Sequence, residues 1–258
     1  MKGLKKRIQQ GEVVMGCWLN LGSSLTAEMV GLAGYDWVLI DLEHGAGEEK
    51  DVLAQLQALE HTNAAGLVRV ESAAPQRIHR VLDAGAEGIM CPHISTMEEA
   101  KQVVSGLRYP PHGSRGVAKM VRATGFGNFA GYSAHANENI VGMVQIESIE
   151  ALQHLDEIAS LDGVDVLFIG PADLTMALGI FGQFDHPAFK DAVKATVRAA
   201  QKAGKATGTL IFNPDDYTTY FNMGLRVIAC GADGTFVAEG ARMMVEKLQS
   251  QKLQSAGK

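Results

Sequence analysis

The chain has 258 residues, of which 47% are hydrophobic and 20% are charged, and its formal net charge is −6. This composition is typical of a globular protein with a large buried core. The acidic balance argues against nucleic acid or an anionic membrane as the main partner. No run reaches the roughly 18 apolar residues that a membrane span needs. The basic start from Met1 to Arg7 precedes no apolar signal core, so we expect a cytoplasmic protein.

Apolar runs bounded by turn signals recur along the whole chain and predict eight strands. Helical stretches separate them, and several of these end at a glycine, such as Gly85, just before the next strand. The predicted strands are Val14–Leu19, Trp37–Ile40, Gly66–Val70, Gly88–Cys91, Val141–Ile146, Val166–Ile169, Ala206–Ile211 and Val227–Cys230. The predicted helices are Ser24–Ala33, Glu48–Glu60, Pro75–Ala84, Thr96–Leu107, Ile149–Ser160, Pro187–Ala203, Pro214–Met223 and about Val237 to Gln251.

Strands that alternate with helices predict a parallel sheet with right-handed crossovers. The length is close to the ~250 residues typical of a (β/α)8 barrel. An open nucleotide-binding sheet would need Gly-x-Gly-x-x-Gly after its first strand, where Leu19–Ser24 has one glycine. We therefore predict an α/β fold, a single (β/α)8 TIM barrel domain over residues 1–258, with a polar tail from about residue 252.

A segment at about 108–139, between the fourth strand's helix and the fifth strand, is much longer than an ordinary connection. It is rich in glycine and aromatic residues, which argues for an ordered, packed loop. Its predicted role is at a subunit interface or as a cover for the active site, with plain surface packing as the alternative.

The carboxyl end of each predicted strand is where a barrel enzyme carries its chemistry. The second strand runs into Asp41-Leu-Glu-His44, which places a carboxylate and an imidazole at one rim. Such a pair suits a general base whose protonation is tuned by a neighbouring acid. The third strand ends in Leu67-Val68-Arg69-Val70, which places Arg69 at the rim, where its charge needs an anion. That anion is either a substrate oxyanion or, in a structural ion pair, Asp41 or Glu43.

Two further acids follow neighbouring strands, Glu147 after the fifth and Asp173 after the sixth. We expect them to lie close together, and two close carboxylates repel unless they share a proton or a cation. With no cysteine and no second histidine expected there, oxygen ligation of Mg²⁺ or Mn²⁺ is predicted, with Co²⁺ as a further candidate. The alternative is that Asp173 only caps a helix, which would leave Glu147 unexplained. Gln145 shares the face of Glu147 by the period of two.

The absence of two kinds of nucleophile from the predicted site narrows the possible reaction types. No predicted strand ends in lysine, which argues against an imine-forming aldolase or a pyridoxal enzyme, and no Gly-x-Ser-x-Gly elbow is present. A divalent metal, an arginine and a histidine base without a nucleophile describe metal-assisted enolisation of an oxo-acid.

The chain resembles the HpcH/HpaI family of class II pyruvate aldolases, within the phosphoenolpyruvate/pyruvate barrel superfamily. The resemblance covers about Leu4 to Leu248. It rests on six motifs in order: Asp41-Leu-Glu-His44-Gly, Val68-Arg69-Val, Leu82-Asp83-Ala-Gly-Ala-Glu-Gly, Arg108-Tyr-Pro-Pro-x-Gly-x-Arg115-Gly, Val144-Gln145-Ile-Glu147 and Gly170-Pro-Ala-Asp173-Leu.

The resemblance implies that His44 is the proton acceptor, that Arg69 stabilises the transition state, and that Glu147 and Asp173 bind the divalent metal. It implies that Gln145, with the backbone at Ala172 and Asp173, holds the pyruvyl part of the substrate.

It also implies that Asp83 raises the basicity of the active-site histidine. From the residues alone, Asp83 belongs to a helix stop; it precedes its strand and lies opposite the other site residues, so a site in a neighbouring subunit is the expectation. Family members form oligomers, commonly hexamers built as trimers of dimers, with the last helix exchanged between subunits.

The expected function is reversible cleavage of a 4-hydroxy-2-oxo acid, of the 4-hydroxy-2-oxoheptanedioate or 2-dehydro-3-deoxyglucarate type, to pyruvate and an aldehyde through a metal-bound pyruvate enolate. The alternative enzymes are a metal-dependent acyl-CoA lyase and an oxaloacetate decarboxylase. The alternative from another class is a barrel that binds an oxo-acid as a sensor or scaffold. The Asp41 and His44 pair favours the aldolase.

Overall fold

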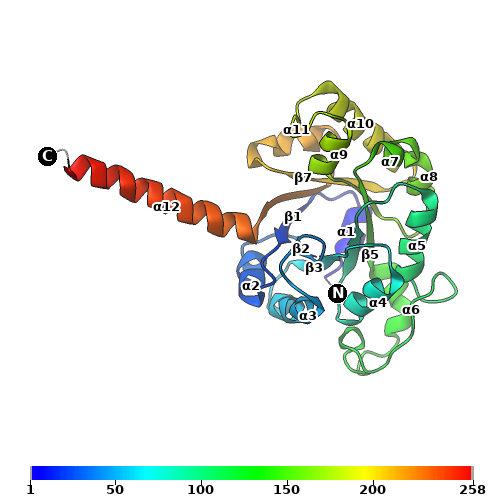
Figure 1. The fold of residues 1–258 in the computed structure, drawn as a ribbon. Helices are drawn as coiled ribbons and strands as arrows, with labels where there is room; N and C mark the ends of the chain where they lie inside the picture. The colour runs from blue at the N-terminus through cyan, green and yellow to red at the C-terminus, as the bar shows by residue number, and fades with distance from the viewer. Residues whose placement is uncertain (1, 257–258) are drawn as a thin grey trace.

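The computed structural model describes residues 2–256. Within them, eight parallel strands close into a barrel in chain order, with helices around the outside (Figure 1). This confirms the predicted (β/α)8 fold. The strands are β1 Val14–Leu19, β2 Trp37–Asp41, β3 Ala65–Arg69, β4 Gly88–Cys91, β5 Val141–Ile146, β6 Val166–Ile169, β7 Ala206–Ile211 and β8 Val227–Ala232.

The helices between successive strands cover the outer face of this sheet, as right-handed crossovers require, whereas the first helix precedes β1 and the last follows β8. The α-helices are α1 Leu4–Gln9, α2 Ser24–Leu32, α3 Glu49–Ala58, α4 Pro75–Asp83, α5 Met97–Leu107, α6 Tyr132–Asn139, α7 Ile149–Gln153, α8 Leu155–Ser160, α9 Pro171–Ala177, α10 Pro187–Lys202, α11 Tyr217–Asn222 and α12 Asp233–Ala256. Short 3₁₀ turns are η1 Leu59–His61, η2 Arg122–Thr124 and η3 Pro214–Asp216.

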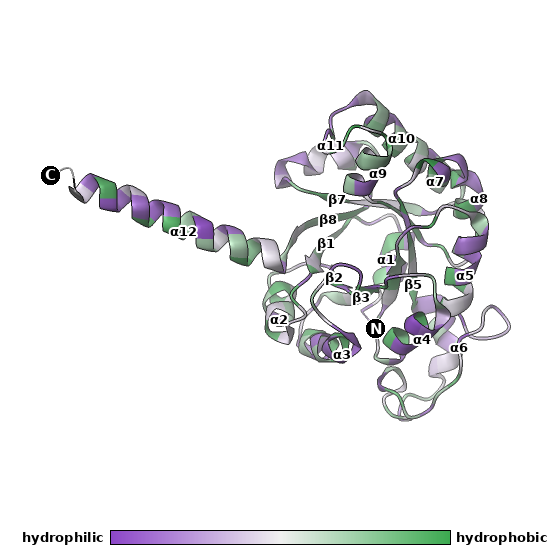
Figure 2. Ribbon diagram, in the orientation of Figure 1, coloured by the Kyte–Doolittle hydropathy of each residue, from purple (hydrophilic) through white to green (hydrophobic). Residues whose placement is uncertain are grey.

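Two apolar layers explain why the strands read as nearly continuous hydrophobic runs. One set of side chains fills the barrel interior, where Trp18, Trp37 and Phe168 meet with ring centroids 5.7–6.3 Å apart. The other set packs between the sheet and the helices, as Val38 and Ile89 do. A parallel strand covered on both faces has no polar side to alternate with. Figure 2 shows this as hydrophobic strands under helices of mixed hydropathy.

Local signals set several helix boundaries. Thr96 and Glu99 form a capping box, with the Glu99 N–H donating to Thr96 Oγ1 at 3.2 Å, so helix α5 begins one residue after the predicted start. Gly85 after α4 has φ of +102°, a left-handed conformation that glycine adopts without a steric penalty.

Some predicted elements differ from the structure. The helix expected over Ile149–Ser160 is two helices separated at His154, and the one expected over Pro214–Met223 begins as a 3₁₀ turn. Helices α1, α6 and α9 were not among the predicted helices, although a helix capped by Asp173 was the alternative considered for that residue. Only Ala136 of α6 is buried, so that sequence lacks the apolar period that signals a packed helix.

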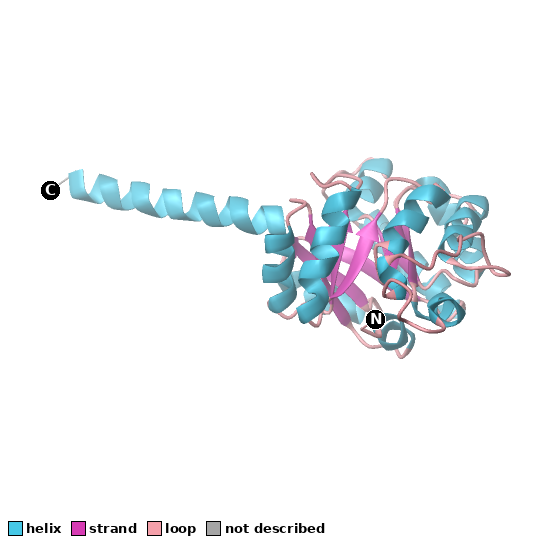
Figure 3. Cartoon of the chain, turned by 90° about the horizontal axis from the view of Figure 1, so that it is seen from below, coloured by secondary structure: helices cyan, strands magenta, loops and turns pink. Residues whose placement is uncertain are grey.

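The last helix is longer than predicted and leaves the barrel. Helix α12 runs to Ala256, through most of the segment expected to be a polar tail, while residues 257–258 lie outside the described residues. Figures 1 and 3 show it projecting away from the other helices as a separate rod. None of the helices in residues 2–256 combines the length and apolarity needed to cross a membrane.

Candidate active site

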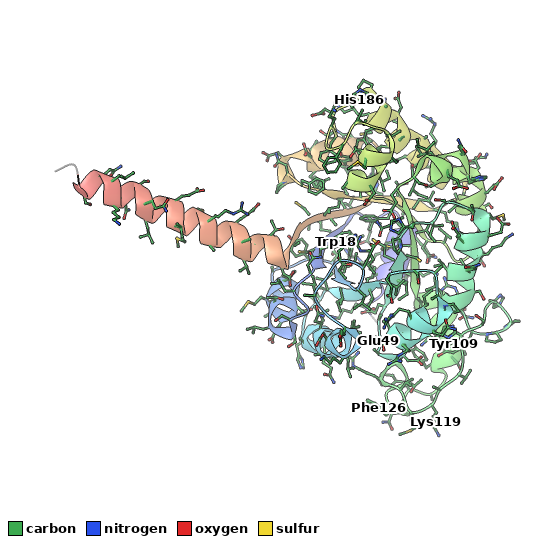
Figure 4. All side chains as sticks on the ribbon, in the orientation of Figure 1. Trp18, Glu49, Tyr109, Lys119, Phe126 and His186 are labelled. Atoms are coloured by element: carbon green, nitrogen blue, oxygen red, sulfur yellow. The ribbon has the colours of Figure 1, made fainter. Side chains whose placement is uncertain are left out.

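The predicted site residues that follow strands gather at one end of the barrel. In a parallel barrel, all strands point the same way, so their carboxyl ends form one rim. Strands β2, β3, β5 and β6 bring their polar residues to this rim, which we call the barrel mouth. Trp18 of β1 belongs to the apolar cluster of the barrel interior (Figure 4), and its ring centroid lies 5.8 Å from the Arg69 guanidinium carbon.

Asp41 and Arg69 form a buried bidentate ion pair. They are direct register partners on β2 and β3. Arg69 Nε donates to Asp41 Oδ1 at 2.9 Å and Nη2 donates to Oδ2 at 2.7 Å, while Asn20 Nδ2 donates to Oδ2 at 2.8 Å. The structural ion pair considered for Arg69 is therefore present, and it fixes the guanidinium in one orientation.

A second carboxylate flanks the same arginine. Arg69 Nη1 lies 2.8 Å from Glu43 Oε2, an ion pair that lacks hydrogen-bond geometry. Burial works against the charge of Arg69, but the hydrogen bonds and charge of Asp41, with Glu43 and Glu147, outweigh it and raise the pKa of Arg69. The guanidinium stays positive at the mouth.

His44 stands at the exposed edge of the mouth, with 69% of its side chain accessible to solvent. Its backbone N–H donates to Asp41 Oδ1 at 3.3 Å, whereas its Nε2 lies 3.8 Å from Glu43 Oε1. The expected pairing of Asp41 with His44 is thus a contact with the backbone. In this protomer, the carboxylate nearest to the imidazole is that of Glu43.

Glu147 is buried and held on both oxygens. Gln145 Nε2 donates to Oε2 at 2.8 Å, and the backbone N–H of His93 donates to Oε1 at 2.6 Å. Burial raises the pKa of Glu147, the N–H and ring of His93 work in the opposite direction, and the carboxylates of Asp173 and Glu43 raise it further. The expectation that no second histidine lies beside these acids was wrong, because the His93 ring also contacts Glu147.

Asp173 and Ala172 lie in the first turn of α9. The N-cap of this helix is Gly170, which puts Asp173 at the third helical position, so the predicted alternative of an Asp173 cap is wrong. The Asp173 carboxylate is exposed toward solvent. The N–H groups of both residues belong to the first helical turn, where intrahelical carbonyls do not reach.

The donor set at this side of the mouth fits a hard divalent cation. Two carboxylates from neighbouring strands repel each other, as the effect of Asp173 on the pKa of Glu147 shows. Gln145 Oε1 is buried without a hydrogen-bond partner, so one more oxygen needs a donor or a cation. Across residues 2–256, no three His, Cys, Asp or Glu side chains group as a metal site, so a cation here would keep several waters.

The structure does not bring Asp83 to this mouth. Asp83 ends helix α4, which leads into β4, and therefore lies near the amino ends of the strands, at the opposite end of the barrel. There it accepts a hydrogen bond of 2.9 Å from Nη2 of the fully buried Arg115, whose guanidinium lies over the ring of Tyr109.

The long segment at 108–139 is at that same opposite end. It joins helix α5 to strand β5, and a helix-to-strand connection of a barrel lies at the amino ends of the strands. Lys119 and Phe126 lie on it, on the side of α6 (Figure 4). This position excludes a cover over the mouth of the same barrel, while a role at a subunit interface stays a prediction. It borders a cavity of about 970 Å³ with Glu87, Arg122 and Phe129 among its lining residues.

Sequence reasoning missed Asn20 and His93 as members of the site, and it named Glu43 only as a possible ion-pair partner of Arg69, a contact that the structure contains. A usable signal existed for His93, which stands two residues after the end of β4, just as Glu43 stands two residues after the end of β2. His93 was overlooked because β4 ends in the apolar residue Cys91, which does not indicate a site residue.

Comparisons with known proteins identify the family. The model of the HpcH/HpaI aldolase/citrate lyase family matches residues 14–240. The chain is 40% identical to a hydroxypyruvate/pyruvate aldolase of Paraburkholderia phytofirmans over 96% of this chain and 97% of that protein. It is 37% identical to a 2-keto-3-deoxy-L-rhamnonate aldolase of Escherichia coli, covering 96% and 93%.

Solved structures agree with this result. A family protein from Burkholderia cenocepacia is 37% identical and superposes with a TM-score of 0.91 over 96% of this chain and all of that one. The resemblance noted from the six motifs is thereby confirmed. The chain belongs to the HpcH/HpaI aldolase/citrate lyase family and is an enzyme of the carbon–carbon lyase type.

Proposed function

We propose that this chain is a metal-dependent class II aldolase that reversibly cleaves a 4-hydroxy-2-oxo acid to pyruvate and an aldehyde. The substrate is of the 4-hydroxy-2-oxoheptanedioate or 2-dehydro-3-deoxy sugar-acid type. The observation that carries the proposal is the mouth itself. A fixed guanidinium, an exposed imidazole and a pair of neighbouring carboxylates share one rim, with no lysine among them. The relatives named as pyruvate and sugar-acid aldolases support the same reaction.

Glu147 and Asp173 would hold the divalent cation, Mg²⁺ or Mn²⁺, with Co²⁺ as a further candidate. When bound, this ion would polarise the 2-oxo group and neutralise negative charge that develops there. Gln145 and the N–H groups of Ala172 and Asp173 bind the carboxylate and oxo oxygens of the pyruvyl part. These groups set the orientation of the substrate before any bond breaks.

His44 takes the proton from the C4 hydroxyl of the substrate. Its exposed ring can reach a substrate that enters the open mouth, and its Nε2 lies 3.8 Å from Glu43 Oε1. As the bond between C3 and C4 breaks, the aldehyde leaves and the pyruvyl part carries the negative charge of an enolate. Arg69, held by Asp41, stabilises that charge, and protonation of C3 then yields pyruvate.

The proposal further concerns the cellular location of the protein, its oligomeric state and its subunit interfaces. The chain acts as one barrel domain in the cytoplasm, in a homo-oligomer, with hexamers built as trimers of dimers. Helix α12 exchanges between subunits, since it leaves its own barrel while exposing apolar side chains such as Met244 and Leu248. Asp83 and the long segment lie at a subunit interface, where Asp83 serves the histidine of a neighbouring subunit.

Proton NMR of pyruvate in D₂O tests the proposal without knowledge of the aldehyde. With protein and Mg²⁺ or Mn²⁺, the methyl signal should disappear as deuterium enters C3, and a chelator should stop the loss. No exchange with any of these metals would reject the aldolase. It would favour a lyase that acts on an acyl-CoA, since the family description includes citrate lyase.

A further inference from the structure

His93 is a residue of the barrel mouth that the proposed reaction does not use. It follows Pro92 directly after β4 and has φ of +56°, in the left-handed region. This conformation is sterically unfavourable for a residue that has a Cβ. Contacts must therefore hold His93 in this conformation, and its polar contacts are with carboxylates.

Three contacts tie His93 to two acids. Its backbone N–H donates to Glu147 Oε1 at 2.6 Å, and its ring Nδ1 lies 3.1 Å from the same oxygen. Its ring Nε2 lies 3.0 Å from Glu43 Oε1. The imidazole thus bridges the acid that follows β2 and the acid that follows β5, although 68% of its side chain is exposed.

The order of the strands shows how the Glu147 carboxylate is oriented between its neighbours. Strand β5, with Glu147, lies between β4 and β6, which precede His93 and Asp173. His93 occupies Oε1 of Glu147 from the β4 side. Oε2 accepts from Gln145 and lies so close to Gly170, at the end of β6, that a Cβ there would collide with it. The carboxylate is therefore oriented with Oε2 toward the strand that carries Asp173.

The bridge also joins the two halves of the mouth. Glu43 contacts Arg69, and Arg69 is paired with Asp41, so polar contacts of 2.7–3.1 Å run without a break from Asp41 to Glu147. The ring of His93 is the link between the half that holds arginine and the half that holds the candidate metal ligands.

We propose that His93 is a positioning residue whose imidazole fixes the carboxylates of Glu43 and Glu147 relative to each other and so presents Glu147 to the divalent cation. This inference rests on the proposed function, because it assigns a cation to Glu147. Groups that orient a metal ligand typically change metal affinity by about 10–100-fold when they are removed.

The test measures binding of Mn²⁺ alone, by titration calorimetry and electron paramagnetic resonance, to the full chain. His93→Gly removes the ring but keeps the backbone N–H, and glycine adopts the left-handed conformation freely. His93→Asn also tolerates this conformation and offers a side-chain amide near the position of Nδ1. His61→Gly, an exposed histidine in η1, is the matched control.

We expect His93→Gly to bind Mn²⁺ about 10-fold or more weakly and to change the resonance spectrum of the bound ion. His93→Asn should lie between this variant and the wild type, and His61→Gly should match the wild type. Because the ring is exposed, added imidazole should enter the space left in His93→Gly and restore part of the affinity. Circular dichroism melting curves check that each variant is folded.

The experiment distinguishes failure of the positioning role of His93 from failure of the proposed metal-dependent function. If folded His93→Gly and His93→Asn bind Mn²⁺ as tightly as the wild type does, His93 has no positioning role, while the metal site stands. If His93→Gly does not fold, unchanged affinity and spectrum in His93→Asn alone overturn the inference, and an intermediate affinity supports it. If the wild type binds no Mn²⁺, the proposed function falls, and the inference with it.

Discussion

Arg69 shows how single residues of this enzyme acquire their roles from the carboxylates around them. Its guanidinium is buried, and such a group is unstable without anions. Asp41 and Glu43 supply them and at the same time hold the guanidinium still. A charge that is already in position needs no reorganisation when an enolate forms beside it, which is the basis of electrostatic catalysis.

At this scale, the first prediction concerns His44. His44→Ala should lower aldol cleavage by roughly 10²-fold or more, because the general base is lost, while Mn²⁺ affinity stays unchanged. Steady-state kinetics with a 4-hydroxy-2-oxo acid and calorimetry measure the two effects. His61→Ala, at the opposite end of the barrel, should retain wild-type rates. Near-normal turnover in His44→Ala would remove His44 from the mechanism.

The second prediction concerns Glu147. Glu147→Gln removes a negative ligand and should weaken Mn²⁺ binding, while the fold persists because glutamine keeps the shape. Burial raises the pKa of Glu147, so its charged form is lost as pH falls through that raised value. Metal affinity of the wild type should therefore decline as pH decreases. Calorimetric titration across the acidic range measures this, and a variant with unchanged affinity would place the cation elsewhere.

At the scale of elements, α12 differs from the other helices because it packs against the barrel only at its start. Asp233, its first residue, is buried and accepts hydrogen bonds from the Asn20 N–H at 2.7 Å and from Thr26 Oγ1 at 2.7 Å. Beyond that anchor, Val237, Met244 and Leu248 share one face by helical spacing, and each is more than half exposed. An apolar stripe on a projecting helix needs a partner surface.

The third prediction follows for assembly. The double variant Met244→Glu with Leu248→Glu puts two charges on this stripe and should shift the particle to a smaller mass in light scattering after gel filtration. Gln249→Glu with Ser250→Glu adds the same charge away from the stripe and should keep the wild-type mass. Equal masses for both variants would mean that α12 does not join subunits.

At the scale of the whole molecule, the interior of the barrel carries much of the stability. Phe168 of β6 is 1% exposed and meets the rings of Trp18 and Trp37 from across the barrel. One residue there contacts strands that are distant in sequence, so a cavity would weaken the entire closed sheet.

The fourth prediction tests that packing. Phe168→Ala should lower the free energy of unfolding by about 3–5 kcal/mol, from lost burial and from the cavity left behind. Urea unfolding followed by tryptophan fluorescence and circular dichroism measures it. Phe181→Ala, at a side chain that is 62% exposed, should change stability by less than about 0.5 kcal/mol. Equal losses in both variants would contradict a tightly packed barrel interior.

The barrel, its strands and the rim positions of Asp41, Arg69, Glu147 and Asp173 could be predicted from the sequence pattern. Buried parallel strands leave unbroken apolar runs, and the polar residues of a barrel enzyme follow at their carboxyl ends. The contacts among these residues could not be predicted in this way. Asp41 meets Arg69 because strand register makes them partners, and His93 joins Glu43 to Glu147 across strands far apart in the chain. The place of the long segment opposite the mouth follows from its position between a helix and a strand, which the sequence pattern already indicated. The contacts among the site residues, by contrast, depend on the register between neighbouring strands and on the closure of the barrel. The pattern of apolar and polar residues along the chain does not specify either of them.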